Sequence, residues 1–281
     1  MSSLHHRPIH NIENTIHLFV EGKFDEVVLN LLLAGCAVDV QPLGSCSVLK
    51  PVAHSPFISK DDFFLIDHDQ YPYSSPFPTK LIWNQRLITW PKRELENYFL
   101  DADFLIQLPN DILNASKEKI EEHVLAICQK RLFFDVVEFV LKSLRMEMRK
   151  VWDQLGPVKD RCHKRDDALQ ALLNMEDWKT ILKTTNQITE QDEIERRFND
   201  YHKLMTGDSG ETLTVGKGHW LSMISGQDVL NELVNNTGIF LNNVTVNDIA
   251  KQLLRVPNVI LPGDFIDLRN TIKQISKQIF K

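Results

Sequence analysis

The chain has 281 residues, 43% of them hydrophobic, which is enough to bury one substantial core or two modest ones. Its formal net charge of -6 argues against a protein that holds nucleic acid by bulk positive charge, so such contacts would need local basic patches or a bridging metal. No stretch approaches the roughly 18 to 20 uncharged apolar residues of a membrane-spanning helix, and the N-terminus lacks the basic and then apolar order of a secretory signal.

The first hundred residues alternate between strand and helix patterns. Residues 1–14 are polar and aperiodic, and we expect a flexible leader there. Strand patterns follow at residues 15–20, 37–43 and 63–66, with an amphipathic helix at 24–34 and a short helix or loop at 45–53 between them. This order predicts a Rossmann-like α/β domain with a parallel sheet over residues 15–105.

The remaining residues show mostly helical spacing. Residues 86–90 indicate one more strand and residues 91–100 the start of a helix. Further helices are predicted at residues 117–129, 132–153, 166–181 and 192–204, and a glycine-rich break at 206–218. We therefore expect a mainly α-helical C-terminal region over residues 106–281, used to bind substrate or a partner and able to pack on the α/β domain.

Acidic residues follow three of the predicted strands. Glu21 comes directly after the first strand, Asp67 and Asp69 follow the apolar run FFLI, and Glu94 and Glu96 follow the strand at 86–90. Loops after successive parallel strands open at one edge of a sheet, so these carboxylates can meet. Glu94 and Glu96 cannot share a helix face, so we expect one of them to face solvent and favour Glu96 for the site.

Such a cluster suits a magnesium ion. Mg²⁺ prefers oxygen ligands and keeps several waters, so one or two carboxylates with substrate phosphate oxygens can hold it, and Mn²⁺ could replace it. Glu21 would face Asp67 and Asp69, either binding a second ion or taking a proton from the attacking water. Each acidic segment alone fits a solvated loop equally well, and their joint order favours the metal site.

The segments LFVEGKFDEVVLNLLL and FFLIDHD resemble the TOPRIM domain of topoisomerases, primases and overcoming-lysogenization-defect nucleases. WPKRELENYFL resembles a bacterial TOPRIM-like family in which a glutamate-asparagine-tyrosine helix follows the aspartate pair. That group includes the nuclease subunit of the PARIS antiphage system. The resemblance covers roughly residues 15–105.

The resemblance implies roles for individual residues. Glu21 matches the general acid or base, Asp67 and Asp69 match the metal-binding pair, and Glu96 matches the glutamate that completes the metal site. Asp25 also matches, as a metal-linked residue. A late lysine that could contact the scissile phosphate corresponds to Lys217, although Gln227 stands where a second lysine is expected nearby.

By resemblance, the expected function is a Mg²⁺-dependent endonuclease that hydrolyses RNA, tRNA included, or DNA. It would be the toxic effector of an antiphage defence that acts by abortive infection, restrained by an ABC-type ATPase partner. The chain has no P-loop of its own. Four scattered cysteines fit the reducing cytoplasm, no membrane contact is expected, and a homodimer would let two sites cut both strands. The alternative is a non-catalytic TOPRIM-like sensor or scaffold that binds the ATPase.

Two further features allow either of two interpretations. Basic residues at 159–165, and Arg145, Arg149 and Lys150 further upstream, fit RNA binding or a solvated helix surface equally well. Tyr98 and Phe99 are more typical of a core than of a platform for stacking bases.

Overall fold

The computed structural model describes residues 15–68, 78–153, 177–208, 210–241 and 243–280. They form two compact units. The first, here called the sheet unit, contains the described residues up to 124 together with those from 226 onward. The second, here called the helical unit, contains the described residues between 125 and 225. The leader predicted over residues 1–14 lies outside the described residues.

The sheet unit is built on five strands in the order β2-β1-β3-β5-β4. Their bounds are β1 (Ile16–Val20), β2 (Val38–Pro42), β3 (Asp62–Ile66), β4 (Ile82–Asn84) and β5 (Leu87–Thr89). The predicted α/β class is confirmed, because β2, β1, β3 and β5 pair in parallel. The expectation of a purely parallel sheet is wrong at one edge, where β4 pairs antiparallel with β5. These two strands form a tight hairpin, with Gln85 of the turn at φ 56° in the left-handed region.

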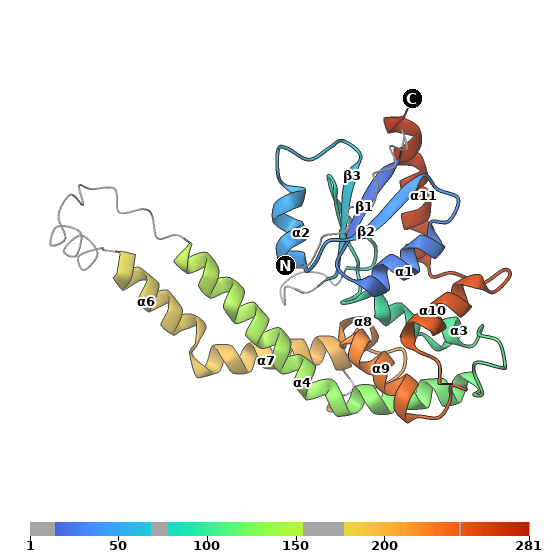
Figure 1. Ribbon diagram of the computed structural model, residues 1–281. Coiled ribbons are helices and arrows are strands. Elements are labelled where there is room, and N and C mark those ends of the chain that lie inside the picture. The colour runs from blue at the N-terminus through green and yellow to red at the C-terminus, as the bar shows by residue number, and fades with distance from the viewer. Residues whose placement is uncertain (1–14, 69–77, 154–176, 209, 242, 281) are drawn as a thin grey trace, which may run out of the picture. The chain divides into compact units, whose positions relative to one another are not determined.

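Helices α1 (Lys23–Leu32) and α2 (Cys46–Ala53) lie on opposite faces of the sheet (Figure 1). In β1 the buried Ile16, Leu18 and Val20 alternate with half-buried residues, as expected for a strand whose side chains point to two faces. Phe19 stacks on Phe64 with ring centroids 5.2 Å apart, in a cluster that also holds Leu49 of α2. The sheet is therefore covered on both sides, as parallel sheets usually are.

The order of the strands reverses direction at β1, which makes the carboxyl ends of β1 and β3 the switch point of the sheet. From β1 the chain passes through α1 to β2 on one side, and from β2 through α2 to β3 on the other side of β1. Ligands bind at such switch points in open α/β sheets.

Later segments complete the sheet unit around an aromatic core. They are a 3₁₀ helix η1 (Leu95–Leu100), α3 (Ala102–Leu105), the start of α4 (Lys117–Trp152), α9 (Gly226–Asn236), α10 (Val246–Arg255) and α11 (Gly263–Ile279). Phe265 of α11 packs against Tyr98 and Trp90, at 4.8 and 5.8 Å between ring centroids. Tyr98 and Phe99 are buried, which confirms that they belong to a core. The helix predicted from residue 91 begins only at Leu95 and has 3₁₀ geometry.

The helical unit contains the rest of α4, then α6 (Asp177–Ile188), α7 (Gln191–Thr206) and α8 (Trp220–Met223). The two helices predicted at residues 117–129 and 132–153 are one continuous helix, α4, and the helix predicted at 192–204 is α7. Most of the helix predicted at 166–181 lies outside the described residues. Among the helices that the structure describes, none is long and apolar enough to cross a membrane.

Candidate active site

Glu21 joins three segments at the switch point of the sheet. It is the first residue after β1, and its two carboxylate oxygens accept different backbone amides. Oε1 accepts the N–H of Asp67, the first residue after β3, and Oε2 accepts the N–H of Cys46, the first residue of α2, both at 2.9 Å. Because two amides hold this carboxylate in place, Glu21 connects the end of β1 to the start of α2 and to the end of β3.

Asp67 lies at the tip of β3, held on its other side by the segment after β5. The amide of Trp90 donates to the carbonyl of Ile66 at 3.1 Å, and the amide of His68 donates to the carbonyl of Arg93 at 3.0 Å. Burial raises the pKa of Asp67 well above its usual value, and the negative charges of Asp25 and Glu21 raise that pKa further. A neighbouring positive charge would act in the opposite direction and lower this pKa.

Asp25 stands in the first turn of α1 and interacts electrostatically with Glu21. Its Oδ2 accepts the backbone amide of Gly22 at 2.8 Å, which fixes the side chain across the start of the helix. Burial raises the pKa of Asp25 to about 6, against the lowering effect of the Gly22 amide, and Glu21 and Glu94 add repulsion. The electrostatic interactions of Asp25 thus link it to acids from β1 and from the segment after β5.

Glu96 is the fourth acid of the group and stands in the first turn of η1. Burial raises its pKa to about 8, with repulsion from Asp25 next in size and a smaller contribution from Glu94. Glu96 is half-buried, whereas the other five residues of η1 are buried. The structure therefore brings Glu21, Asp25, Asp67 and Glu96 into one electrostatic neighbourhood.

Glu94 departs from the expectation that one acid of the pair would face solvent. It is the extended residue that precedes η1, and both Glu94 and Glu96 are half-buried. The Oε2 atom of Glu94 accepts the amide of Gln227, in the first turn of α9, at 2.7 Å. The Glu94 carboxylate therefore satisfies a free N–H at a helix start, a role that spacing within 94–96 alone could not reveal.

The contact between η1 and α9 requires glycine at position 226. A Cβ atom there would come within 2.6 Å of the amide nitrogen of Asn97 and 2.7 Å of its side-chain oxygen. Asn97 is fully buried, and its Oδ1 accepts the amide of Glu94 at 2.9 Å. Sequence analysis missed Asn97 and Gly226 as site residues, since the partners lie more than a hundred positions apart and no local pattern connects them.

We name Glu21, Asp25, Asp67, Glu94 and Glu96 the acidic cluster. Within the described part of the chain, no three His, Cys, Asp or Glu side chains are already gathered closely enough to enclose a metal ion. Asp69, the remaining predicted ligand, lies outside the described residues. The donor set nevertheless fits Mg²⁺ or Mn²⁺, because both accept carboxylate oxygens and Mg²⁺ needs only one or two of them. The raised pKa values at Asp25, Asp67 and Glu96 come from burial first and from repulsion between the acids second, while Arg93 Nε lies 3.5 Å from Glu94 Oε1 and offsets part of the negative charge.

Lys217 belongs to the helical unit, whereas the acidic cluster belongs to the sheet unit. It stands in a tight loop whose neighbours Gly216 and Gly218 have φ values of 77° and 63°. Its amide donates to the carbonyl of Thr214 at 3.1 Å, and its side chain is exposed. Its contact with a scissile phosphate stays a prediction. The basic residues at 159–165 lie outside the described residues.

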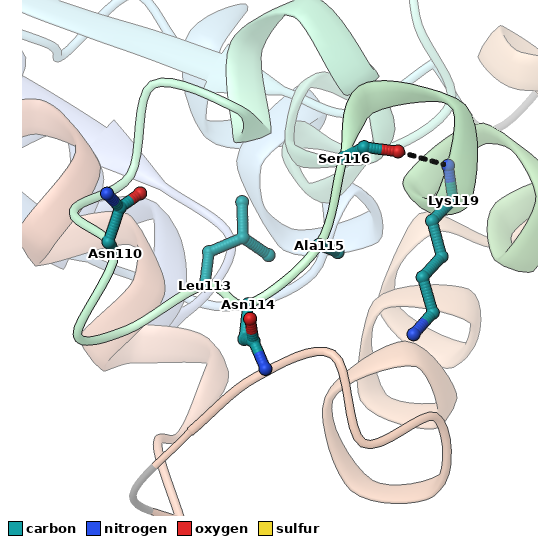
Figure 2. A pocket seen from close by; sticks show the side chains of 6 residues that line it. All are labelled: Asn110, Leu113, Asn114, Ala115, Ser116 and Lys119. Carbon is teal, nitrogen blue, oxygen red and sulfur yellow. Dashed lines mark hydrogen bonds between the residues drawn. The ribbon is translucent and has the colours of Figure 1, made fainter.

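The sheet unit also has a polar pocket at the start of α4 (Figure 2). Its volume is about 510 Å³, and the amide of Lys119 donates to Ser116 Oγ beside it at 3.4 Å. No member of the acidic cluster lines this pocket, which is formed by Asn110, Leu113, Asn114, Ala115, Ser116 and Lys119. The described residues that line the pocket include no carboxylate side chain.

Neither models of known protein families nor curated proteins give a match to this sequence.

Proposed function

We propose that the chain is a TOPRIM-type, Mg²⁺-dependent nuclease that hydrolyses phosphodiester bonds at the acidic cluster. The observation that carries the proposal is the hydrogen bond from the Asp67 amide to Glu21 across the switch point, with Asp25 and Glu96 close enough to repel Asp67. These are the acids expected to act together from the sequence. Parallel-sheet topology supports their use in binding a ligand.

The residues would divide the work as follows. Asp67, Asp69 and Glu96 would hold the ion, and Asp25 would be linked to it through the first turn of α1. A divalent ion bound there would supply positive charge to the phosphate oxygens and lower the pKa of a bound water. Glu21 is oriented by two amides, and its remaining lone pairs would receive the proton of the attacking water. Phosphodiester hydrolysis would then require a water positioned for attack and a positive charge beside the leaving oxygen.

The substrate class and setting rest on the resemblance of the sequence. RNA, tRNA in particular, is the substrate we propose, with DNA as the other candidate. Release from an ABC-type ATPase in the cytoplasm during abortive antiphage defence is the proposed trigger. A nuclease that harms its host needs such restraint, and the chain has no P-loop to supply ATP hydrolysis itself.

One observation favours the alternative, a sensor or scaffold that binds the ATPase. Glu21 and Glu94 both use carboxylate oxygens to accept backbone amides of distant segments. Acids with that role would be kept for folding and assembly even in a protein without catalysis. The two functions differ in whether Asp67 and Glu96 are required, since neither side chain accepts the amide of a distant segment within the part of the chain that the structure describes.

The deciding experiment is cleavage of labelled tRNA, single-stranded RNA and DNA with Mg²⁺ or Mn²⁺. Wild type is compared with Asp67→Asn and Glu21→Gln, and with Asp39→Asn as a matched control, because Asp39 lies on β2 with its side chain half exposed. Cleavage by wild type and by the control, with loss in the other two, supports the nuclease. Equal cleavage by all four proteins would exclude it, and binding of an ATPase without any cleavage would favour the scaffold.

A further inference from the structure

Helix α4 carries an unusual surface on its outward side within the helical unit. The residues at positions 134, 137, 141, 145, 149 and 152 recur at spacings of three and four, so they share one face of the helix. We name them the α4 face: Phe134, Val137, Leu141, Arg145, Arg149 and Trp152. Four are large apolar residues and two are arginines.

The α4 face is exposed although it is largely apolar. Phe134 is 59% exposed and Trp152 46%, and Val137 and Leu141 are also solvent-facing. The opposite side of the same helix is buried, through Val136, Phe139 and other residues that pack within the unit. An apolar stripe this long on the free side of a helix is a common mark of a binding surface.

Arginine and aromatic side chains are combined on this face. Arg145 and Arg149 are exposed, with the Arg149 side chain at 84%, and Arg149 forms an ion pair with Asp153 at 3.8 Å. The Arg131 guanidinium lies 5.4 Å from the centre of the Phe134 ring, next to the face. Cations beside flat exposed rings suit a single-stranded nucleic acid, because phosphates meet the cations and bases stack on the rings.

Charge favours this occupant over a parallel pairing with a second copy of the chain. Arg131 is ion-paired with the buried Asp135 at 3.4 Å, so the exposed cations that a phosphate backbone would meet on this face are Arg145 and Arg149. A parallel pairing of two copies would place each of these arginines near its own equivalent. An antiparallel pairing would instead bring Glu138, on the same side of the helix, near Arg145 and Arg149 of the other copy, and the sedimentation measurement below tests for that pairing. A polyanion meets the same cations favourably, although the whole chain carries a net charge of -6.

We infer that the α4 face binds single-stranded RNA. The inference rests on the proposed function, since it supplies that function with a surface for its substrate. The face spans nineteen residues of helix, from 134 to 152, a length of roughly 27 Å, which is enough for several nucleotides. Binding here requires no base-specific contact, so it would be tolerant of sequence.

The test measures binding separately from cleavage. An Asp67→Asn background keeps the RNA intact, and fluorescence anisotropy follows a fluorescein-labelled unstructured RNA of about 15 nucleotides over a range of salt concentrations. Arg145→Gln with Arg149→Gln should weaken binding about tenfold and reduce the slope of log K against log salt by roughly 1.4. Phe134→Ser with Trp152→Ser should weaken binding about tenfold and leave the slope unchanged.

The matched control is Lys273→Gln with Lys277→Gln on α11. These two lysines are exposed, four residues apart and in the second half of their helix, like the two arginines. Binding within about twofold of the background protein is expected for this control. All variants are checked by circular dichroism, and if the aromatic pair does not fold, the arginine pair decides alone because its side chains are exposed.

Two results would overturn the inference. One is an unchanged affinity and salt slope in the arginine variant. The other is a Phe134→Ser with Trp152→Ser variant that changes from dimer to monomer in sedimentation velocity while its RNA affinity is kept, which would make the α4 face a self-association surface. Cleavage by wild type is scored separately, so failure of the nuclease and failure of the α4 face are distinguishable.

Discussion

The carboxylate of Glu21 accepts the backbone amide of Asp67 at 2.9 Å, although the two residues lie 46 positions apart. This hydrogen bond places a charged oxygen next to a second acid, Asp67, whose pKa burial and repulsion raise. Folding therefore holds close together acids whose negative charges repel one another. The packing of the sheet and of its covering helices offsets this repulsion. The repulsion should still lower the free energy of unfolding, which can be measured.

Stability without metal should fall as pH rises. The pKa of Glu96 is raised from 4.5 to about 8, chiefly by burial, and that of Asp25 from 3.8 to about 6. Both raised pKa values mean that the folded state holds protons that the unfolded chain has lost, so the stability present below pH 4 is lost as pH rises through 6 and then 8. We expect a loss on the order of a few kcal/mol, seen as a fall in Tm of roughly 5 to 10 °C between pH 5 and 8.5 in EDTA.

The same measurement with Mn²⁺ tests the acidic cluster as a metal site. Metal binding requires ionised carboxylates, so Mn²⁺ should raise Tm more at pH 8 than at pH 6. Asp67→Asn removes one charge from the group and should make Tm both less dependent on pH and less responsive to Mn²⁺. A flat Tm across this pH range in EDTA would contradict the electrostatics described for the cluster.

Glu94 and Glu96 offer a comparison at constant charge. Glu94→Gln keeps an oxygen that can accept the Gln227 amide, while Glu96→Gln removes a proposed metal ligand. Initial rates of RNA cleavage at saturating Mn²⁺ should fall roughly a hundredfold for Glu96→Gln and less than about fivefold for Glu94→Gln. Equal losses would show that the acids act through total charge and not through separate roles.

Much of the sheet unit could be predicted because its signals are local. The apolar strands at β1 and β3 are followed directly by Glu21 and Asp67, and a parallel sheet places such residues at one edge. The strand β4 could not be predicted, since it has only three residues and its Ile82 is exposed. Hairpin partners of that length depend on the neighbouring strand for their structure.

The support behind the acids could not be predicted for a different reason. Asn97 contacts Gly226, and Glu94 contacts Gln227, across more than 125 positions of sequence. Helical spacing describes one segment at a time and does not say which segments pack together. The predicted break near residue 130 failed similarly, because α4 continues past Lys130 and Arg131 on tertiary contacts of its buried side.

Gly226 tests this packing directly. Gly226→Ala would place a methyl group 2.6 Å from the Asn97 amide nitrogen, which neither backbone can easily avoid. We expect a loss of about 2 to 3 kcal/mol in the free energy of unfolding, measured by urea denaturation. Gly263→Ala is the matched control, since Gly263 also begins a helix and a Cβ there meets nothing within 4 Å. A similar loss of stability in both variants would mean that replacing glycine at the first residue of a helix is destabilising in itself, and that the contact with Asn97 is not the cause.

Arg197 and Arg196, adjacent on α7, should differ greatly in their effect on the helical unit. Arg197 is 1% exposed and reaches α4, donating to Glu147 at 2.6 Å and to Ser143 at 3.2 Å, and it also pairs with Glu193 at 2.8 Å. Arg196 makes ion pairs with Glu193 and Asp200 on the surface. Arg197→Ala leaves a cavity and breaks charged hydrogen bonds, so we expect the free energy of unfolding to fall by about 2 to 4 kcal/mol. The loss should be smaller than for a fully buried ion pair, because the side chains of Glu147 and Glu193 are partly exposed to solvent.

Arg196→Ala should cost less than about 1 kcal/mol, as exposed ion pairs usually do. Thermal unfolding followed by the circular dichroism of the α-helices measures the destabilisation in both variants, which differ from wild type at neighbouring positions of one helix. Arg197→Met separates packing from charge, because it refills most of the volume without hydrogen bonds. If Arg197→Met is as stable as wild type, α7 is held to α4 mainly by packing; if it is as unstable as Arg197→Ala, the charged network holds it. Near-equal stability of Arg197→Ala and Arg196→Ala would contradict the buried placement of Arg197.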